Sequence, residues 1–160
     1  MKHIFLDYNS TTPVGPEVLN AMLPYFNESF GNAASRNHSY GINAKEAVEK
    51  ARKQIADLIN CYYKEIIFTS GATESINLGL KGFTNNKIGY NKQYLSLSTE
   101  HKAVLDCLNS LKSDNIIVKI LNVKNNGLVD LTELENYLST HNVSLISIMH
   151  ANNEIGVIQP

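Results

Sequence analysis

Short β-rich runs alternate with helical patterns over residues 65–149. Strands are expected at residues 65–69, 94–98, 116–121 and 144–149, and helices at residues 73–81, 101–111 and 131–138. Parallel strands need a crossover between them, usually a helix, so this alternation is typical of an α/β domain. We therefore expect an α/β fold with a mainly parallel sheet and flanking helices.

The part of the chain before residue 65 has a helical pattern. Pro16 suits the first turn of a short helix, and a polar loop at residues 28–40 precedes the clearest helix, at residues 41–60. One face of that helix carries Ala44, Ala47, Val48, Ala51, Ile55, Leu58 and Ile59. We expect an N-terminal arm at residues 1–15 and an incomplete domain at residues 16–160, truncated after the strand at 144–149 and its loop.

The composition argues against several kinds of partner. The 160 residues are 43% apolar, which is enough for one core, and the net charge of −1 gives no electrostatic basis for binding nucleic acid or an anionic membrane. Asp7 comes too early for a secretory leader, so we expect a cytoplasmic protein. Cys61 and Cys107 form no Cys-x-x-Cys pair, so we expect no metal site and interpret both as structural.

Polar segments directly follow three of the predicted strands. They are residues 70–73, 99–101 and 150–153. Ligands of open parallel sheets bind beyond the carboxyl ends of the strands, so these segments are the candidate site.

The first segment combines a glycine with a helix start. The N–H groups at a helix start attract anions, Gly71 permits close approach of a phosphate, and the Thr73 hydroxyl adds a donor. The alternative is a simple helix cap at Ser70 or Thr73, which this motif alone favours.

The other two segments offer an imidazole and two amides. His101 opens a helix, where the dipole disfavours the imidazolium, so it suits a neutral base near physiological pH; a lone histidine there is more often a surface or capping residue. Asn152 and Asn153 end a strand, where amides hold a phenolate, a carboxylate or, most often, a turn.

Five segments together resemble the group I cysteine desulfurases, which are fold-type I, aspartate-aminotransferase-like enzymes of the aminotransferase class V type that use pyridoxal phosphate. The segments are residues 7–13 (DYNSTTP), 30–36 (FGNAASR), 69–75 (TSGATES), 99–104 (TEHKAV) and 149–156 (MHANNEIG), in the family's order. The resemblance implies the N-terminal part of the large domain of that fold.

The resemblance also implies roles for individual residues. Gly71, Ala72 and Thr73 match the turn that binds the cofactor phosphate. His101 matches the histidine that stacks on the pyridine ring and assists proton transfers. Asn152 matches the asparagine that hydrogen-bonds the phenolic oxygen and lies near the substrate carboxylate.

The family reaction removes sulfur from L-cysteine, releases alanine and leaves a persulfide on a cysteine thiol. Family members are homodimers that pass the sulfur to acceptors such as scaffold proteins, for iron–sulfur cluster assembly or tRNA thiolation. The resemblance therefore implies pyridoxal phosphate as cofactor, L-cysteine as substrate and a homodimer.

The 160 residues contain no match to the family's Schiff-base lysine or persulfide cysteine. Lys102 superficially fits the lysine motif, but the residues after it continue the histidine segment, so we reject that assignment. We expect these residues alone to be inactive. The alternatives are a non-catalytic interaction or dimerisation remnant of the fold and part of a selenocysteine lyase-like enzyme.

Overall fold

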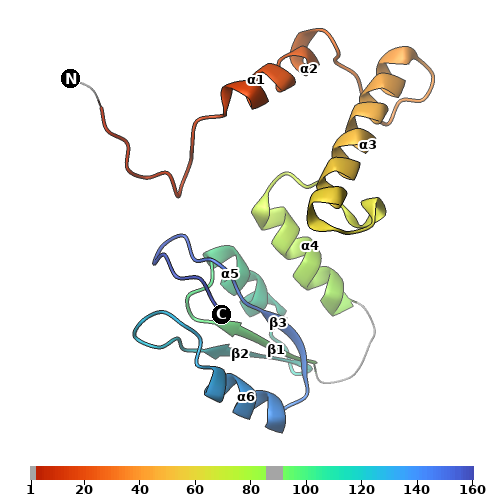
Figure 1. The fold of residues 1–160 in the computed structure, drawn as a ribbon. Helices are drawn as coiled ribbons and strands as arrows, with labels where there is room; N and C mark the ends of the chain where they lie inside the picture. The colour runs from red at the N-terminus through yellow and green to blue at the C-terminus, as the bar shows by residue number, and fades with distance from the viewer. Residues whose placement is uncertain (1–2, 86–91) are drawn as a thin grey trace. The chain divides into compact units, whose positions relative to one another are not determined.

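The computed structural model describes residues 3–85 and 92–160. The chain divides into two compact units, Met1–Phe68 and Thr69–Pro160. Figure 1 shows the ribbon of both units, coloured by residue number, and the sheet lies in the second unit.

The first unit is helical. Its helices are α1 (Pro16–Met22), α2 (Pro24–Asn27), α3 (Ser39–Ile59) and the 3-10 helix η1 (Tyr63–Glu65). Before α3, the Nδ1 atom of His38 accepts a hydrogen bond from the Gly41 N–H at 3.2 Å and caps the helix start. The helix ends at Asn60, whose backbone is left-handed with φ of 54°. The helix predicted at residues 41–60 is confirmed, and it begins two residues earlier.

The strand predicted at residues 65–69 is wrong. Residue 65 belongs to η1, and residues 66–69 pair with no strand in the described part of the chain. Instead, Arg52 of α3 donates a hydrogen bond to the Ile66 carbonyl and lies over the Phe68 ring, 5.0 Å from its centroid. A strand needs a neighbouring strand for its backbone N–H and C=O groups, and this apolar run has none among the described residues. It contacts helix α3 instead.

The second unit has the predicted α/β alternation. Its elements are α4 (Ala72–Asn85), β1 (Lys92–Leu97), α5 (Lys102–Leu111), β2 (Ile116–Leu121), α6 (Leu131–Thr140) and β3 (Val143–Ser147). The three strands are parallel, in the order β2-β1-β3. The mainly parallel sheet is thus confirmed, with β3 ending two residues before the predicted boundary.

Successive side chains of β1 point to opposite faces of the sheet, and both faces are covered. Tyr94 packs with Leu80 of α4 and Leu108 of α5, whereas Leu95 and Leu97 pack in a second cluster with side chains of α6. Helices α4 and α5 therefore cover one face and α6 the other (Figure 1).

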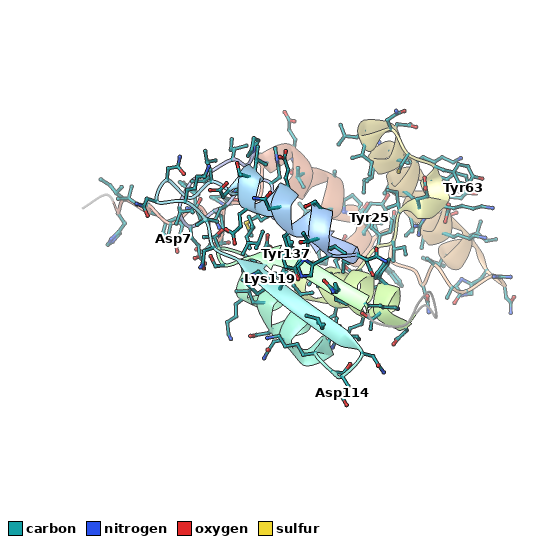
Figure 2. All side chains as sticks on the ribbon, turned by 90° about the horizontal axis from the view of Figure 1, so that it is seen from below. Asp7, Tyr25, Tyr63, Asp114, Lys119 and Tyr137 are labelled. Atoms are coloured by element: carbon teal, nitrogen blue, oxygen red, sulfur yellow. The ribbon has the colours of Figure 1, made fainter. Side chains whose placement is uncertain are left out.

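Contacts of the Tyr137 side chain hold α6 against its face of the sheet. The Lys119 ammonium of β2 lies 5.7 Å from the centroid of the Tyr137 ring, and the two side chains are neighbours in Figure 2. The Tyr137 hydroxyl donates to Gln93 Oε1 at 3.3 Å. On α6, the His141 ring stacks on the Tyr137 ring at 4.0 Å.

The strand order reverses direction around β1. Helix α5 leads from β1 to β2 on one side, and α6 returns the chain to β3 on the other side of β1. Ligands of open α/β sheets bind beyond the carboxyl ends of the strands at such a reversal. The loops that follow β1 and β3 are therefore the place to look for a site.

Candidate functional site

Helix α4 begins next to a glycine and is capped by an acidic side chain. The N–H and the hydroxyl of Ser70 both donate to Glu74 Oε2, at 2.6 and 2.7 Å. These two hydrogen bonds lower the pKa of the Glu74 carboxyl, so the group is held as a carboxylate. Ser70 lies before the helix and donates to its first turn, which is not the helix cap that the sequence suggested, and Thr73 is the second residue of the helix.

The remainder of this helix start is open to a ligand. A Cβ atom on Gly71 would meet nothing within 4 Å, and both Ala72 and Thr73 are exposed. The first N–H groups of a helix have no carbonyl partner inside it and carry the positive end of the dipole. An anion can approach Gly71, Ala72 and Thr73, although ionised Glu74 adds a negative charge to the same helical turn.

His101 is the N-cap residue of α5. Its Nδ1 atom accepts a hydrogen bond from the Ala103 N–H at 3.1 Å, and its side chain is exposed. Because Nδ1 is an acceptor, the neutral ring carries its hydrogen on Nε2. The cap therefore fixes the ring and leaves Nε2–H as the group that can donate to a ligand.

Asn152 is buried in the loop after β3, with 9% of its surface exposed. Its Oδ1 atom accepts from the N–H groups of Glu154 and Ile155 at 2.8 and 2.9 Å, and its Nδ2 atom donates to the Thr99 carbonyl at 2.7 Å. The turn chemistry that the sequence suggested is present. A side-chain amide has two hydrogens, so one N–H of Asn152 is left for a ligand.

Glu100 is a site residue to which the sequence gave no role. It is only 8% exposed, and its carboxylate accepts a hydrogen bond from the Met149 N–H. Burial raises the pKa of Glu100, and the hydrogen bond from the Met149 N–H opposes that rise. The feature of the sequence that could have pointed to Glu100 is its position directly before His101 in the candidate segment.

Two of the predicted site residues, His101 and Asn152, lie in loops at one edge of the sheet in the second unit. The loops that carry His101 and Asn152 follow β1 and β3, which are paired and parallel. The hydrogen bond from Asn152 Nδ2 to the Thr99 carbonyl joins the two loops. Lys92, the first residue of β1, donates through Nζ to the Thr84 carbonyl at 2.6 Å, so the last turn of α4 lies at the amino end of β1. Helix α4 packs beside α5, and its Leu80 lies in the same core cluster as Tyr94 of β1.

Other reactive side chains include a lysine on α5 and two cysteines. The Lys102 side chain is 83% exposed and pairs with Asp106 at 2.9 Å on α5. Cys107 is buried in the core and Cys61 is partly exposed, and both are free thiols. No cluster of three or more metal-ligating side chains is found in residues 3–85 and 92–160. None of the helices described there has the length and apolar character to cross a membrane.

Comparisons with known proteins cover almost the whole chain. Residues 4–160 match the family model for aminotransferase class-V. The chain is 51% identical over 156 residues to the cysteine desulfurase IscS of Neisseria meningitidis and 49% identical over 157 residues to that of Rickettsia prowazekii. Each alignment covers 98% of this chain but 38% of the relative, so the chain spans well under half the relatives' length.

Solved structures give the same pattern of similarity. A NifS-like protein matches with a TM-score of 0.87 and 39% identity, over 96% of this chain and 42% of that protein. SspA, in a complex with cysteine, matches with a TM-score of 0.85 and 35% identity, over 96% and 44%. DndA from Streptomyces lividans matches with a TM-score of 0.79 and 38% identity, over 98% and 44%.

Proposed function

The chain belongs to the aminotransferase class-V family, and we propose that it supplies the N-terminal part of a cysteine desulfurase that works with pyridoxal phosphate. One observation carries the proposal. His101, fixed by its own cap, and Asn152, with one N–H to spare, lie in loops that follow two paired parallel strands, and the same unit contains the open start of α4. A planar, phosphorylated ring needs such a set of groups.

The residues fit that cofactor. Gly71, Ala72 and Thr73 would hold the phosphate through backbone N–H groups and the Thr73 hydroxyl, since no described atom lies within 4 Å of the Cβ position of Gly71. Asn152 would donate its remaining N–H to the phenolic oxygen, and the ring of His101, fixed by its bond to Ala103, would stack on the cofactor ring. When bound, pyridoxal phosphate supplies the electron sink that lets bonds at the substrate Cα and Cβ break.

His101 holds a transferable proton at a defined atom. The Ala103 N–H keeps Nδ1 as an acceptor, so the proton that the neutral ring can share lies on Nε2. To bind a second proton, the ring must give up its bond to Ala103. We propose that His101 orients its partner by donating a hydrogen bond from Nε2, for which the fixed ring needs no reorganisation. Proton transfer through the ring would require Nδ1 to accept a proton and to release the Ala103 N–H.

The proposed reaction takes sulfur from L-cysteine, releases alanine and transfers the sulfur to a protein thiol as a persulfide. The similarity to a structure in complex with cysteine supports this substrate. The proposal extends to a cytoplasmic homodimer that delivers sulfur to a scaffold protein. It also extends to an arm at residues 1–15 followed by one cofactor-binding domain at residues 16–160.

Cofactor binding is best tested with deoxypyridoxine phosphate, which has no aldehyde and so cannot react with surface lysines. Calorimetric titration of the 160-residue chain should show binding that Thr73→Val weakens by about tenfold, because a hydrogen bond to a charged group is lost. Thr132→Val is the matched control, since Thr132 is the second residue of α6 as Thr73 is of α4. Equal weakening by both variants, or no binding at all, contradicts the proposal.

The reaction itself requires a longer protein that includes these residues. Such a protein, loaded with pyridoxal phosphate, should release alanine from L-cysteine, and the isolated 160 residues should release none. Alanine release by the isolated chain would contradict the expected inactivity. A longer protein that binds the cofactor but releases no alanine would contradict the desulfurase assignment.

A further inference from the structure

Glu100 is a buried carboxyl group that the proposed reaction does not use. It is 8% exposed and follows β1 by three residues, between Thr99 and His101. Buried carboxylates are uncommon unless they are paired or hydrogen-bonded, because removal from water is costly. Its partner is the backbone N–H of Met149.

The loops after β1 and β3 hold each other by reciprocal bonds. The side chain of Glu100 in the first loop binds the Met149 N–H in the second. The side chain of Asn152 in the second loop binds the Thr99 carbonyl in the first, at 2.7 Å. Each side chain therefore fixes the backbone of the other loop, and the two bonds lie a few residues apart.

Met149 lies beyond the last ladder bond of the sheet. Strand β3 ends at Ser147, so the pairing with β1 does not set the position of residues 148–152. A hydrogen bond from the Met149 N–H to Glu100 then relates this loop to the loop carrying His101.

We propose that Glu100 is a positioning residue, which holds Asn152 at a fixed place relative to His101 by accepting the Met149 N–H. The inference rests on the proposed function, since it assigns Glu100 to the same site. It predicts that the acceptor oxygen matters, whereas the negative charge does not. A glutamine at this position keeps an oxygen for Met149, alanine removes it, and aspartate is one methylene too short to reach.

The holding role is tested on the 160-residue chain without ligand. Glu100→Ala should speed amide hydrogen exchange at Met149 about tenfold and loosen the Asn152 side-chain amide, with core amides such as Leu108 unchanged. Glu100→Gln should restore wild-type rates, and Glu135→Ala, on the exposed surface of α6, should have no effect. If the alanine variant does not fold, Glu100→Asp should give the same local loosening.

Wild-type exchange at Met149 and Asn152 in the folded Ala or Asp variant overturns the proposal. Hydrogen exchange that Glu100→Gln speeds as much as Glu100→Ala does also overturns the proposal. The acceptor oxygen, which glutamine keeps, would then not be what holds the loop.

The role in the site is tested by adding deoxypyridoxine phosphate and following the ring signals of His101 by NMR. The ligand should shift these signals in the wild type and in Glu100→Gln, whereas Glu100→Ala should bind about tenfold more weakly with smaller shifts. Equal affinity and equal shifts in Glu100→Ala refute the positioning role. If the wild type itself binds nothing, the proposed function fails, and the exchange rates alone decide whether Glu100 holds the two loops.

Discussion

The side-chain amide of Asn152 donates to the carbonyl oxygen of Thr99 over 2.7 Å, and this bond joins the loops that follow two neighbouring strands. The same side chain accepts two N–H groups of its own turn, from Glu154 and Ile155. Asn152 therefore stabilises the edge of the sheet at which it is proposed to bind a ligand. Its structural and binding roles are separable, because they use different hydrogens of one amide.

Asn152→Asp should destabilise the chain by about 1–3 kcal/mol. The substitution keeps an acceptor for the turn but replaces the donor to Thr99 by an oxygen, so a partly buried carbonyl loses its partner and faces an oxygen. Urea denaturation at neutral pH measures the loss. Asn153→Asp is the control, since Asn153 is the exposed neighbour. Equal stabilities of the two variants would show that the bond to Thr99 contributes nothing.

Two glycine substitutions should act in opposite directions. Gly127 has φ of +80°, and a Cβ there would lie 2.8 Å from side-chain atoms of Ile155 and Val157, so Gly127→Ala should cost more than about 1 kcal/mol. Gly79 lies inside α4 with nothing near its Cβ position, so Gly79→Ala should stabilise the chain by up to about 1 kcal/mol. Thermal unfolding of both variants measures the two changes. A change of melting temperature with the same sign in both variants would contradict the prediction.

The sequence predicted the α/β unit well because its elements are set by local pattern. β2 has the predicted bounds, and the central strand β1 is buried on both faces as an apolar strand of a parallel sheet should be. The apolar run at residues 65–69 was misread, since periodicity cannot tell a strand from a segment that packs on a helix. On α3 the helix was predicted correctly, but in the predicted apolar face Ala44 is buried while Ile59 is 59% and Leu58 84% exposed, because the pattern does not say what covers a helix.

The candidate site was predicted only in part. His101 and Asn152 stood out because polar residues at strand ends are expected to line a site. Glu100 did not, because a glutamate next to a histidine usually lies in solvent, and its burial depends on Met149, which is 49 residues away in the chain. Long-range contacts of this kind have no signature in a single sequence.

The stability of the chain should respond to pH through Glu100. Burial raises the pKa of this carboxyl above its ordinary value of 4.5. A group of this kind adds stability that is complete below the ordinary value and is lost as the pH rises through the raised value. Glu100→Gln cannot titrate, so its free energy of unfolding relative to wild type should increase as the pH rises from about 4 through that range. A difference that stays constant with pH, measured by urea denaturation, would contradict the raised pKa.

Glu74→Gln should strengthen the binding of deoxypyridoxine phosphate about threefold at low ionic strength. The Glu74 carboxylate lies in the first turn of α4, bonded to Ser70, and repels a phosphate at the same helix start. The gain should shrink with added salt, because the charges are exposed and screened. Glu133→Gln is the matched control, at the third position of α6. A gain independent of salt, or the same gain in the control, would argue against charge repulsion.

Substitutions of His101 should separate its two roles. Asparagine is a good N-cap and can accept from the Ala103 N–H, but it has neither a ring to stack nor an Nε2–H. His101→Asn should therefore keep the stability of the chain within about 0.5 kcal/mol, whereas His101→Ala should lose about 1 kcal/mol with the cap. Both should weaken deoxypyridoxine phosphate binding to a similar extent, because both lack the ring. Urea denaturation and calorimetric titration of the two variants give the comparison. Wild-type affinity in His101→Asn would mean that His101 is only a helix cap.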